Sequence, residues 1–478
     1  MLLGPKLNKN KTDANFSPEN SLGIEGVAAS MQGDICPVVT TVTPRAFYWA
    51  FLVWIYYDFY TFFPAQEKNY DLFIEHLRRQ DFFFVAATLL SENDNTNLGG
   101  IRKVTELLKR EGDVPFNNDY LRVDYGAMND YTSGCASRDL LCTKEGENDL
   151  SFPKLNSVSV EIGKNFEKII KNTRYYKEYR LSDKAVPREV LKEYGQVINL
   201  GLNGFDEVKA ILRHRFFDTD FRLSKCAKYI AFLFKETHFQ NLSAESCRRL
   251  FFDHVTEEGK YISIPEDLKY ISDAWEIVIG RMYFSIGLGM IWKYMLETIE
   301  TPMKKDEWMK TVLKNAFLEI DIDKPVKSLL PECRFDFETR EDFINNARLG
   351  YDAECYAEDG LSILFSIYNW LKDRQDFGEE KLFLNYGNDS DSISLKSFEQ
   401  TVDEYIDKPI KEFLIFIMDK WLIVQHFNTA FEKLFYNIDG FFYEVIDDKY
   451  YKKHNYSVGF QGIRMTQLYR IMQDLDML

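Results

Sequence analysis

The longest apolar stretch of the chain runs from Ala46 to Phe63 and consists almost entirely of aromatic and aliphatic residues. Thr43 and Pro44 precede it. This pair is typical of a helix start, because threonine caps a free backbone N–H and proline tolerates the first helical position. Asp58 interrupts the stretch, which is also shorter than the roughly 20 apolar residues that a membrane span typically needs. The pattern therefore predicts a buried core helix rather than a membrane-spanning one.

Arg45 would lie in the first turn of this predicted helix. The positive end of the helix dipole disfavours a cation there. We therefore expect the guanidinium of Arg45 to be paired with a carboxylate, of this chain or of a partner, or with a phosphate. Arg45 is for this reason a candidate binding residue.

Further helices follow from apolar residues that recur at helical spacing. They are expected after Pro64 as far as Leu90, along 272–300 as one long helix that Pro302 ends, along 413–435, and along 464–475. Phe441 to Ile446 is typical of a strand, and Asp447 to Lys449 of a turn. The sequence thus predicts a mainly α, multi-helical fold with small β insertions around 112–156 and 436–460.

Breaks in the pattern suggest four consecutive segments. Residues 1–22 are polar and rich in Asn and Lys, and are expected to form a flexible arm. Residues 23–156 are predicted to form an N-terminal helical domain with an elaborated, Gly-, Asn- and Asp-rich loop. Residues 157–330 are predicted to form a central helical domain, and residues 331–478 a C-terminal helical domain with a short β region. The last boundary rests on the prolines at 325 and 331.

Charge limits the partners. The net charge of −16 argues against a protein that coats nucleic acid indiscriminately. Residues 161–260, however, contain 19 Lys and Arg against 15 Asp and Glu, while the remainder contains 40 against 60. Contact with phosphates is therefore expected to be local, through this middle segment.

Within that segment a basic stripe precedes a run in which cations and rings alternate. The stripe is spaced i, i+4, i+7 and i+10, which places it on one helix face, and the run after it adds stacking planes. The alternative is a solvated helix face balanced by acidic neighbours. The candidate nucleic-acid-binding or partner-binding residues here are Lys164, Lys168, Lys171, Arg174, Tyr175, Tyr179 and Arg180.

No catalytic constellation emerges. The six histidines form no metal-binding pair, and no nucleophile elbow, Walker loop or dinucleotide fingerprint occurs, so neither a catalytic residue, nor a metal, nor a cofactor is predicted. Glu207 and Lys209 match the Glu-x-Lys fragment of metal-dependent nucleases, which belongs on a strand, but their neighbours carry apolar residues at helical spacing. Residues 319–323 place three carboxylates on one face of an expected strand, either a Mg²⁺ site or an exposed edge.

The cysteines and the N-terminus bear on location. The chain has seven cysteines, an odd number without a Cys-x-x-Cys pair, which favours a reducing cytoplasm over a disulfide framework or a zinc ribbon. Lys6, Lys9 and Lys11 are not followed by an apolar stretch, so no signal peptide is predicted. A cytoplasmic location without membrane attachment is expected.

The two ends of the chain carry motifs found together elsewhere. The N-terminal elements are Leu22-Gly23-Ile24-Glu25 and Thr43-Pro44-Arg45-Ala46-Phe47-Tyr48, and the C-terminal elements are Ala430-Phe431-Glu432-Lys433-Leu434, Arg464 with Leu468, and Asp474-Leu475-Asp476. This outline resembles a loose group of uncharacterised proteins encoded in bacterial defence islands beside helicases, ATPases and nucleases. The similarity covers about sixty residues at each end. The chain departs from the commoner motif at Pro44, and at Phe47, where arginine is frequent.

The resemblance implies a non-catalytic subunit of a bacterial anti-phage defence or DNA-maintenance complex. Its partners would be other subunits of the same operon, an ATPase, a helicase or a nuclease, with DNA or RNA as a further partner. Two alternatives stay open: a metal-dependent nuclease subunit that uses Glu207 and Lys209, and a helical enzyme with a substrate pocket near Arg45.

Overall fold

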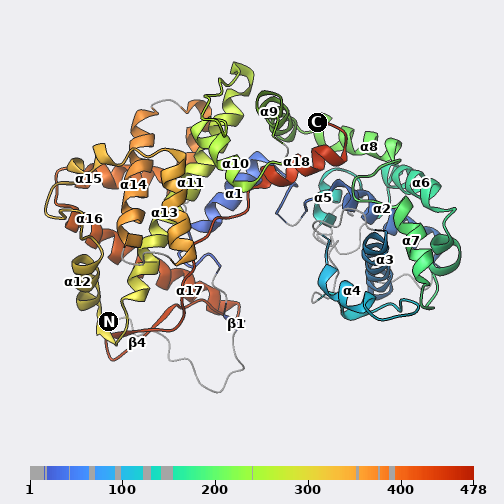
Figure 1. The fold of residues 1–478 in the computed structure, drawn as a ribbon, viewed down its shortest axis with the longest axis horizontal. Coiled ribbons are helices and arrows are strands. Elements are labelled where there is room, and N and C mark those ends of the chain that lie inside the picture. Colours follow the sequence, from blue (N-terminus) through green and yellow to red (C-terminus); the bar gives the residue numbers. More distant parts are fainter. Residues whose placement is uncertain are drawn as a thin grey trace. The chain divides into compact units, whose positions relative to one another are not determined.

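The protein forms two compact units, each assembled from segments far apart in sequence (Figure 1). Unit 1 comprises Met1–Ile35 and Ala244–Gly462, and unit 2 comprises Cys36–Ser243 and Ile463–Leu478. The computed structural model describes residues 15–16, 19–41, 43–63, 70–91, 98–121, 131–141, 154–239, 241–350, 355–374, 377–386 and 393–478. The predicted arm at 1–22 thus lies mostly outside the described residues.

The expected domain boundaries at 156/157 and 330/331 do not coincide with the edges of these units. The first lies inside unit 2 and the second inside unit 1. Proline and glycine mark places where the local backbone turns, and such turns connect helices within a unit as well as between units. Met1–Ile35 belongs to one unit with Ala244–Gly462, and Ile463–Leu478 belongs to the other with Cys36–Ser243. Such pairing of distant segments leaves no signal in the local sequence from which the units could be predicted.

Unit 2 is helical throughout its described part. Its helices are α2 (Ala46–Phe62), α3 (Tyr70–Leu90), α4 (Ile101–Leu108), α5 (Thr132–Ser137), α6 (Ser157–Ile170), α7 (Arg188–Val197), α8 (Asp206–Arg213), α9 (Phe221–Thr237) and α18 (Arg464–Asp474). Short 3₁₀ or π turns lie at η1 (Asn118–Tyr120), η3 (Tyr175–Tyr179) and η4 (His214–Asp218). The β insertion expected within 112–156 is reduced, in its described part, to one isolated bridge between Val114 and Val186.

The core of unit 2 is built on α2, as its apolar sequence predicts. Every residue from Ala46 to Phe59 is buried, and the helix packs against α6 and α3. The helix begins two residues later than predicted. Thr43 does not cap it, since its Oγ1 accepts a hydrogen bond from the backbone N–H of Thr40 at 2.9 Å instead. Arg45 is the N-cap residue, with extended backbone angles.

Unit 1 contains the remaining helices and two small sheets. Its helices are α1 (Glu25–Ile35), α10 (Ala244–Arg248), α11 (Glu266–Glu297), α12 (Lys305–Asn315), α13 (Phe337–Leu349), α14 (Tyr356–Asp373), α15 (Leu395–Tyr405), α16 (Ile410–Phe416) and α17 (Gln425–Phe435). The π segments η5 (Arg249–Asp253) and η10 (Ile417–Val424) and the 3₁₀ turns η6 (Val326–Ser328), η7 (Leu330–Glu332) and η9 (Gly378–Asn385) complete them. The strands are β1 (Asn15–Phe16), β2 (Met303–Lys304), β3 (Ile438–Asp439), β4 (Tyr443–Ile446) and β5 (Lys449–Lys452).

The mainly α fold with small β insertions is confirmed, and the strand predicted at 441–446 appears as β4. Asp447 and Asp448 turn the chain with φ angles of 51° and 60°, so that β4 pairs antiparallel with β5. The sheet has the order β2-β5-β4, and β1 pairs with β3 in a separate parallel pair. The strand expected at 319–323 does not form, because Asp321 and Asp323 lie in an exposed turn beside Lys324 and Lys411.

The long helix predicted at 272–300 is α11, which forms the core of unit 1 against α14 and α1. The two helices α11 and α14 approach closely at a pair of glycines. A Cβ atom on Gly287 would lie 2.9 Å from the carbonyl oxygen of Gly360, so neither position tolerates a side chain without movement. Among the described residues, α11 is the one helix with the length and composition of a membrane span, and its apolar window is entirely buried within the unit.

Candidate functional site

Arg45 pairs with a carboxylate of the same chain, as its position at a helix start predicts. Its Nε and Nη2 donate to the two carboxylate oxygens of Asp474 on α18, at 3.0 and 2.9 Å. Asp474 also accepts from the backbone N–H of Ala46 at 3.1 Å, so this one carboxylate neutralises Arg45 and caps α2. Both side chains are buried. With its guanidinium held in this way, Arg45 serves as a structural residue of unit 2.

The four cations of the basic stripe are exposed, but they do not share one helix face as predicted, because α6 ends at Ile170. Lys164 and Lys168 lie on α6, Lys171 is its C-cap residue, and Arg174 precedes η3. Lys168 lies 3.5 Å from the carboxylate of Glu207. Within the described part of the chain, no carboxylate lies within 4 Å of the cationic groups of the other three. The charged groups of these three side chains are therefore available to a phosphate or an acidic partner, although the carboxylate of Glu193 accepts from the backbone N–H of Arg174 at 3.0 Å.

The residues that follow the stripe are differently placed. Tyr175 is buried, and its hydroxyl donates to Gln80 at 3.1 Å. Arg180 is also buried, with its guanidinium carbon 3.9 Å from the centre of the Tyr176 ring. Tyr179 alone of the three predicted residues stays partly exposed. The hypothesis of a stacking surface for bases is thus wrong for Tyr175 and Arg180.

The cause is the π turn η3. The backbone N–H of Arg180 donates to the carbonyl of Tyr175 at 2.9 Å, five residues before it. A π turn holds one residue more than an α turn, which rotates the following side chains away from the face that α spacing predicts. The same turn carries Arg180 inward to the otherwise uncompensated charge of α2.

That charge is Asp58, the residue that interrupts the apolar stretch. Its two carboxylate oxygens lie 2.9 Å from Nη1 of Arg180 and 3.1 Å from Nε2 of His76. All three side chains are buried. Because removal of one partner from a buried pair leaves a charge without compensation, this cluster fixes α2, α3 and η3 to one another. The sequence signal for this cluster was Asp58, an acidic residue within an apolar helix. Its partners Arg180 and His76 could not be predicted from the sequence.

The residues of the nuclease hypothesis do not converge. Glu207 and Lys209 lie on α8, a helix as their apolar neighbours indicated. Glu207 is exposed beside Lys168, whereas Lys209 is buried and its Nζ contacts Asp476 at 2.7 Å. Within the described ranges, no group of three or more His, Cys, Asp or Glu residues is arranged to hold a metal ion. The hypothesis of a Mg²⁺ site at 319–323 is wrong, because the strand that would have placed its three carboxylates on one face does not form.

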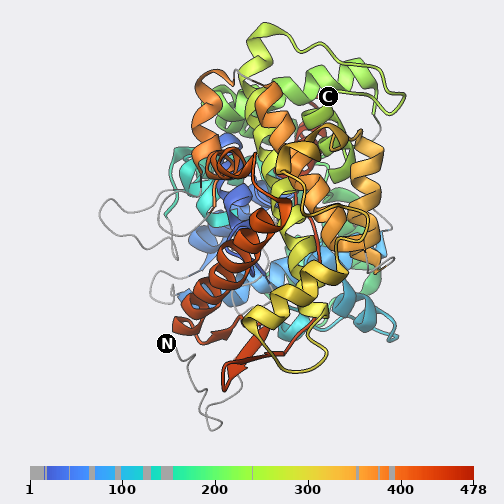
Figure 2. The ribbon, with the colours of Figure 1, turned by 90° about the vertical axis from the view of Figure 1, so that its left-hand side faces the viewer.

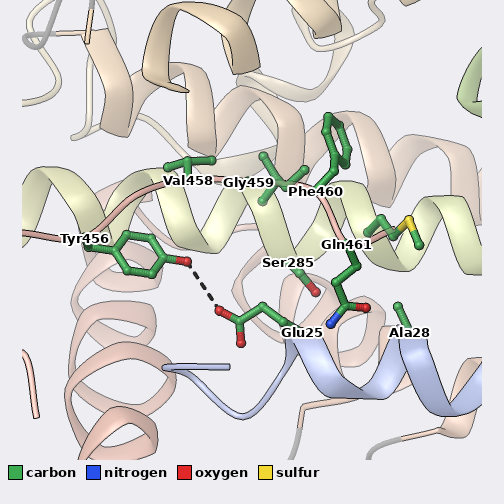
Figure 3. Close-up of a pocket in the computed structure, with 10 residues that line it drawn as sticks. Glu25, Ala28, Ser285, Tyr456, Val458, Gly459, Phe460 and Gln461 are labelled. Carbon is green, nitrogen blue, oxygen red and sulfur yellow. Dashed lines mark hydrogen bonds between the residues drawn. The ribbon is translucent and has the colours of Figure 1, made fainter. Parts of the chain in front are cut away.

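A small cavity in unit 1 lies between α1, α11 and the segment before α18 (Figure 3). Its volume is about 20 Å³, enough for about one water molecule. The hydroxyl of Tyr456 donates to Oε1 of Glu25 at 3.3 Å, while Oε2 of Glu25 and Oε1 of Gln461 are buried and have no hydrogen-bond partner among the residues that the structure describes. Burial raises the pKa of Glu25. These acceptors suit a bound water, and the cavity is too small for a substrate.

A larger polar cleft of about 520 Å³ lies elsewhere in unit 1, where η5 meets α13 and α14. Its charges are paired internally. Arg374 bridges Asp273 and Glu276, and Glu276 also accepts from Nε1 of Trp370 at 2.7 Å. Arg340 pairs with Asp253, whose pKa is raised by burial. This cleft is shaped by structural ion pairs that hold η5 against α13 and the end of α14 against α11.

The two ends of the resemblance meet inside each unit. In unit 1 the carbonyl of Ser21 accepts from Nδ1 of His426 at 2.9 Å, and a Cβ on Gly23 would lie 2.7 Å from Oγ1 of Thr429. Gly23 has a φ of 70°, which favours glycine. In unit 2 the motif residues Arg45 and Asp474 form the pair described above. The motif residues Arg45 and Asp474 thus join the two ends in unit 2, while in unit 1 Gly23 and the preceding Ser21 contact residues that lie just before the C-terminal motif.

Comparisons with known proteins add nothing further, since neither a protein-family model, nor a curated protein, nor a solved structure matches this chain.

Proposed function

We propose that the chain is a non-catalytic subunit of a bacterial anti-phage defence or DNA-maintenance complex in the cytoplasm. In this proposal unit 2 holds nucleic acid by its phosphates, and unit 1 binds protein partners of the same operon. The observation that carries the proposal is a set of three exposed cations, Lys164, Lys171 and Arg174, whose charged groups have no carboxylate within 4 Å among the described residues.

The distribution of charge between the units supports this assignment. Counted over the sequence, unit 1 contains 29 Lys and Arg against 45 Asp and Glu, whereas unit 2 contains 30 of each. The entire net charge of −16 therefore belongs to unit 1. A local group of free cations on a neutral unit attracts phosphates more strongly than the net charge of the whole chain suggests.

The fate of the other charged groups agrees with a binding role. Arg45, Lys209 and Arg180 each pair with a carboxylate of the same chain. Their charges therefore stabilise the fold and do not face a ligand. The meeting of the motif-bearing ends gives the resemblance a physical basis, because it explains why residues so far apart in sequence would recur together.

The test is nucleic-acid binding by the purified full chain, measured by fluorescence anisotropy at low salt with a labelled 20-nucleotide strand and the matching duplex. The variant Lys164→Glu, Lys171→Glu, Arg174→Glu should lose binding. A matched variant in unit 1, Lys304→Glu, Lys310→Glu, Lys314→Glu, changes the net charge equally on an exposed face of α12 and should retain it. Equal loss in both variants would show a nonspecific effect of charge and contradict the proposal.

A further inference from the structure

An aromatic stripe lies exposed on α17 of unit 1. Phe435 is 78% exposed and Tyr436 79%, while Phe431 and Val424 are 41% and 39% exposed. The opposite face of the helix, with Gln425, His426 and Ala430, is buried in the unit. The helix is at the front of Figure 2, drawn in red. Large apolar side chains gathered in one exposed place mark an interaction surface.

The stripe has the spacing of a helix-packing seam. On α17, Asn428, Phe431 and Phe435 follow one another at intervals of three and four residues, as in the a/d repeat of a coiled coil, and Val424, the last residue of the π segment η10, lies four residues before Asn428. Asn428 is the single polar residue of this seam and is half-buried. A lone asparagine at such a position sets the register and the number of helices that pack together. The seam is thus patterned to receive another helix.

The rings are held in place by their neighbours. Phe431 stacks on Phe427 with ring centres 6.0 Å apart and planes at 13°, and Phe427 in turn packs against Phe441. Phe435 meets the edge of Phe431 at 5.5 Å. Rigid aromatic anchors of this kind carry most of the binding at protein interfaces.

A second copy of the chain is a poor occupant. Weighted by their exposed fractions, the side chains of Phe431, Phe435 and Tyr436 offer about 300–500 Å² per copy, if a fully buried aromatic contributes about 150–250 Å². Two copies would bury about 600–1,000 Å² between these rings, less than the roughly 1,200 Å² of a stable interface. Self-association would also bring together two units that each carry the whole net charge of −16.

The charged residues beside the seam indicate which kind of helix would bind there. Glu432 lies beside the seam, at the position that sets partner choice in coiled coils, and it is exposed. The neighbouring cation, Lys433, is turned to the chain, where its Nζ donates to the carbonyl of Glu19. We propose that α17 docks a helix of a partner protein that is apolar along one seam and flanked by Lys or Arg. This inference deepens the partner-binding half of the proposed function and rests on it.

The test uses a 28-residue synthetic helix with Leu at its seam positions, one central Asn, and Lys at every flanking position. The Lys residues also keep the peptide from pairing with itself. A second peptide carries Glu instead of Lys. Binding to the full chain is measured by fluorescence anisotropy for three proteins. They are the wild type, the double variant Phe431→Ser with Phe435→Ser, and the single variant Tyr261→Ser. Tyr261 is a matched control, 67% exposed in unit 1 and outside the seam.

We expect the Lys peptide to bind wild type and Tyr261→Ser equally, and to bind the double variant at least tenfold more weakly. The Glu peptide should bind wild type at least tenfold more weakly than the Lys peptide. Circular dichroism should show the double variant folded, because its two rings are exposed. Equal affinity for wild type and double variant, equal affinity of both peptides, or no binding of either would overturn the proposal.

Sedimentation velocity on the chain alone should show a monomer. A concentration-dependent dimer that Phe435→Ser abolishes would instead identify a second copy as the occupant. None of these outcomes bears on phosphate binding, which is measured with substitutions in unit 2.

Discussion

Replacing Asp474 should destabilise unit 2 far more than replacing a surface carboxylate. Asp474 is 5% exposed, and its carboxylate accepts two hydrogen bonds from Arg45 and one from the backbone N–H of Ala46. Asp474→Ala removes the carboxylate that pairs with the buried Arg45 guanidinium, which costs about 3–5 kcal/mol. Loss of the cap on α2 is part of the same change and is worth about 1 kcal/mol where it acts alone.

For a unit of about 220 residues, each kcal/mol lowers Tm by about 2–4 °C. Asp474→Ala should therefore lower the unfolding transition of unit 2 by about 6–20 °C. Scanning calorimetry measures this, with hydrogen exchange at the start of α2 as a local readout. Arg45→Met combined with Asp474→Leu should recover part of the loss, because an apolar pair leaves no buried charge.

The control is Glu207→Ala, which removes the exposed partner of Lys168 in the same unit and should leave Tm nearly unchanged. If Asp474→Ala shifts Tm no more than Glu207→Ala does, the reasoning that this pair holds α18 to α2 is refuted.

Three further predictions concern single residues. Burial lowers the pKa of His426 to about 4, below its value of 6.5 in the unfolded chain, so its contribution to stability is complete above pH 6.5 and is lost as the pH falls towards 4. This loss of stability is roughly 3 kcal/mol. Between pH 6.5 and pH 4, the Tm of His426→Gln should therefore fall less than the Tm of wild type. Gly195→Ala should destabilise unit 2 by about 1–3 kcal/mol, since the new Cβ would lie 2.3 Å from the carbonyl oxygen of Ala87. The control Gly201→Ala meets only ordinary contacts, so its free energy of unfolding in urea should stay close to that of wild type. Tyr175→Ala should lower Tm rather than change the preference for single strands over duplex, and an unchanged Tm with selectively weaker single-strand binding would contradict its burial.

The helices were predictable because their apolar spacing is a local signal. α2 and α11 are buried on every side, so their sequences are apolar on every side, whereas α18 shows a clear helical period. β4 was indicated by its aromatic and β-branched residues and not by alternation, since only Tyr443 of its four residues is buried. The expectation for Arg45 also held, since a cation at a helix start must find an opposite charge somewhere. Its partner lies 429 residues away and left no trace in the local pattern.

The candidate site was predictable only in part. Lys164, Lys171 and Arg174 are exposed because nothing in the fold requires their charge. Tyr175 and Arg180 look equivalent in sequence, yet a π turn and the buried Asp58 draw them into the core. Exposure of Phe435 could not be predicted either, since an apolar helix with one face in the core and one face free has the composition of a fully buried one.

The salt dependence of nucleic-acid binding tests the central claim most directly. Each neutralised phosphate releases counterions and contributes about −0.9 to the slope of log affinity against log salt on duplex, and about −0.7 on single strands. If Lys164, Lys171 and Arg174 each contact a phosphate, the duplex slope of wild type should exceed that of the neutral variant Lys164→Ala, Lys171→Ala, Arg174→Ala by about 2.7 in magnitude. Two equal slopes, or no binding by wild type at low salt with or without its operon partners, would show that the stripe is only a solvated face.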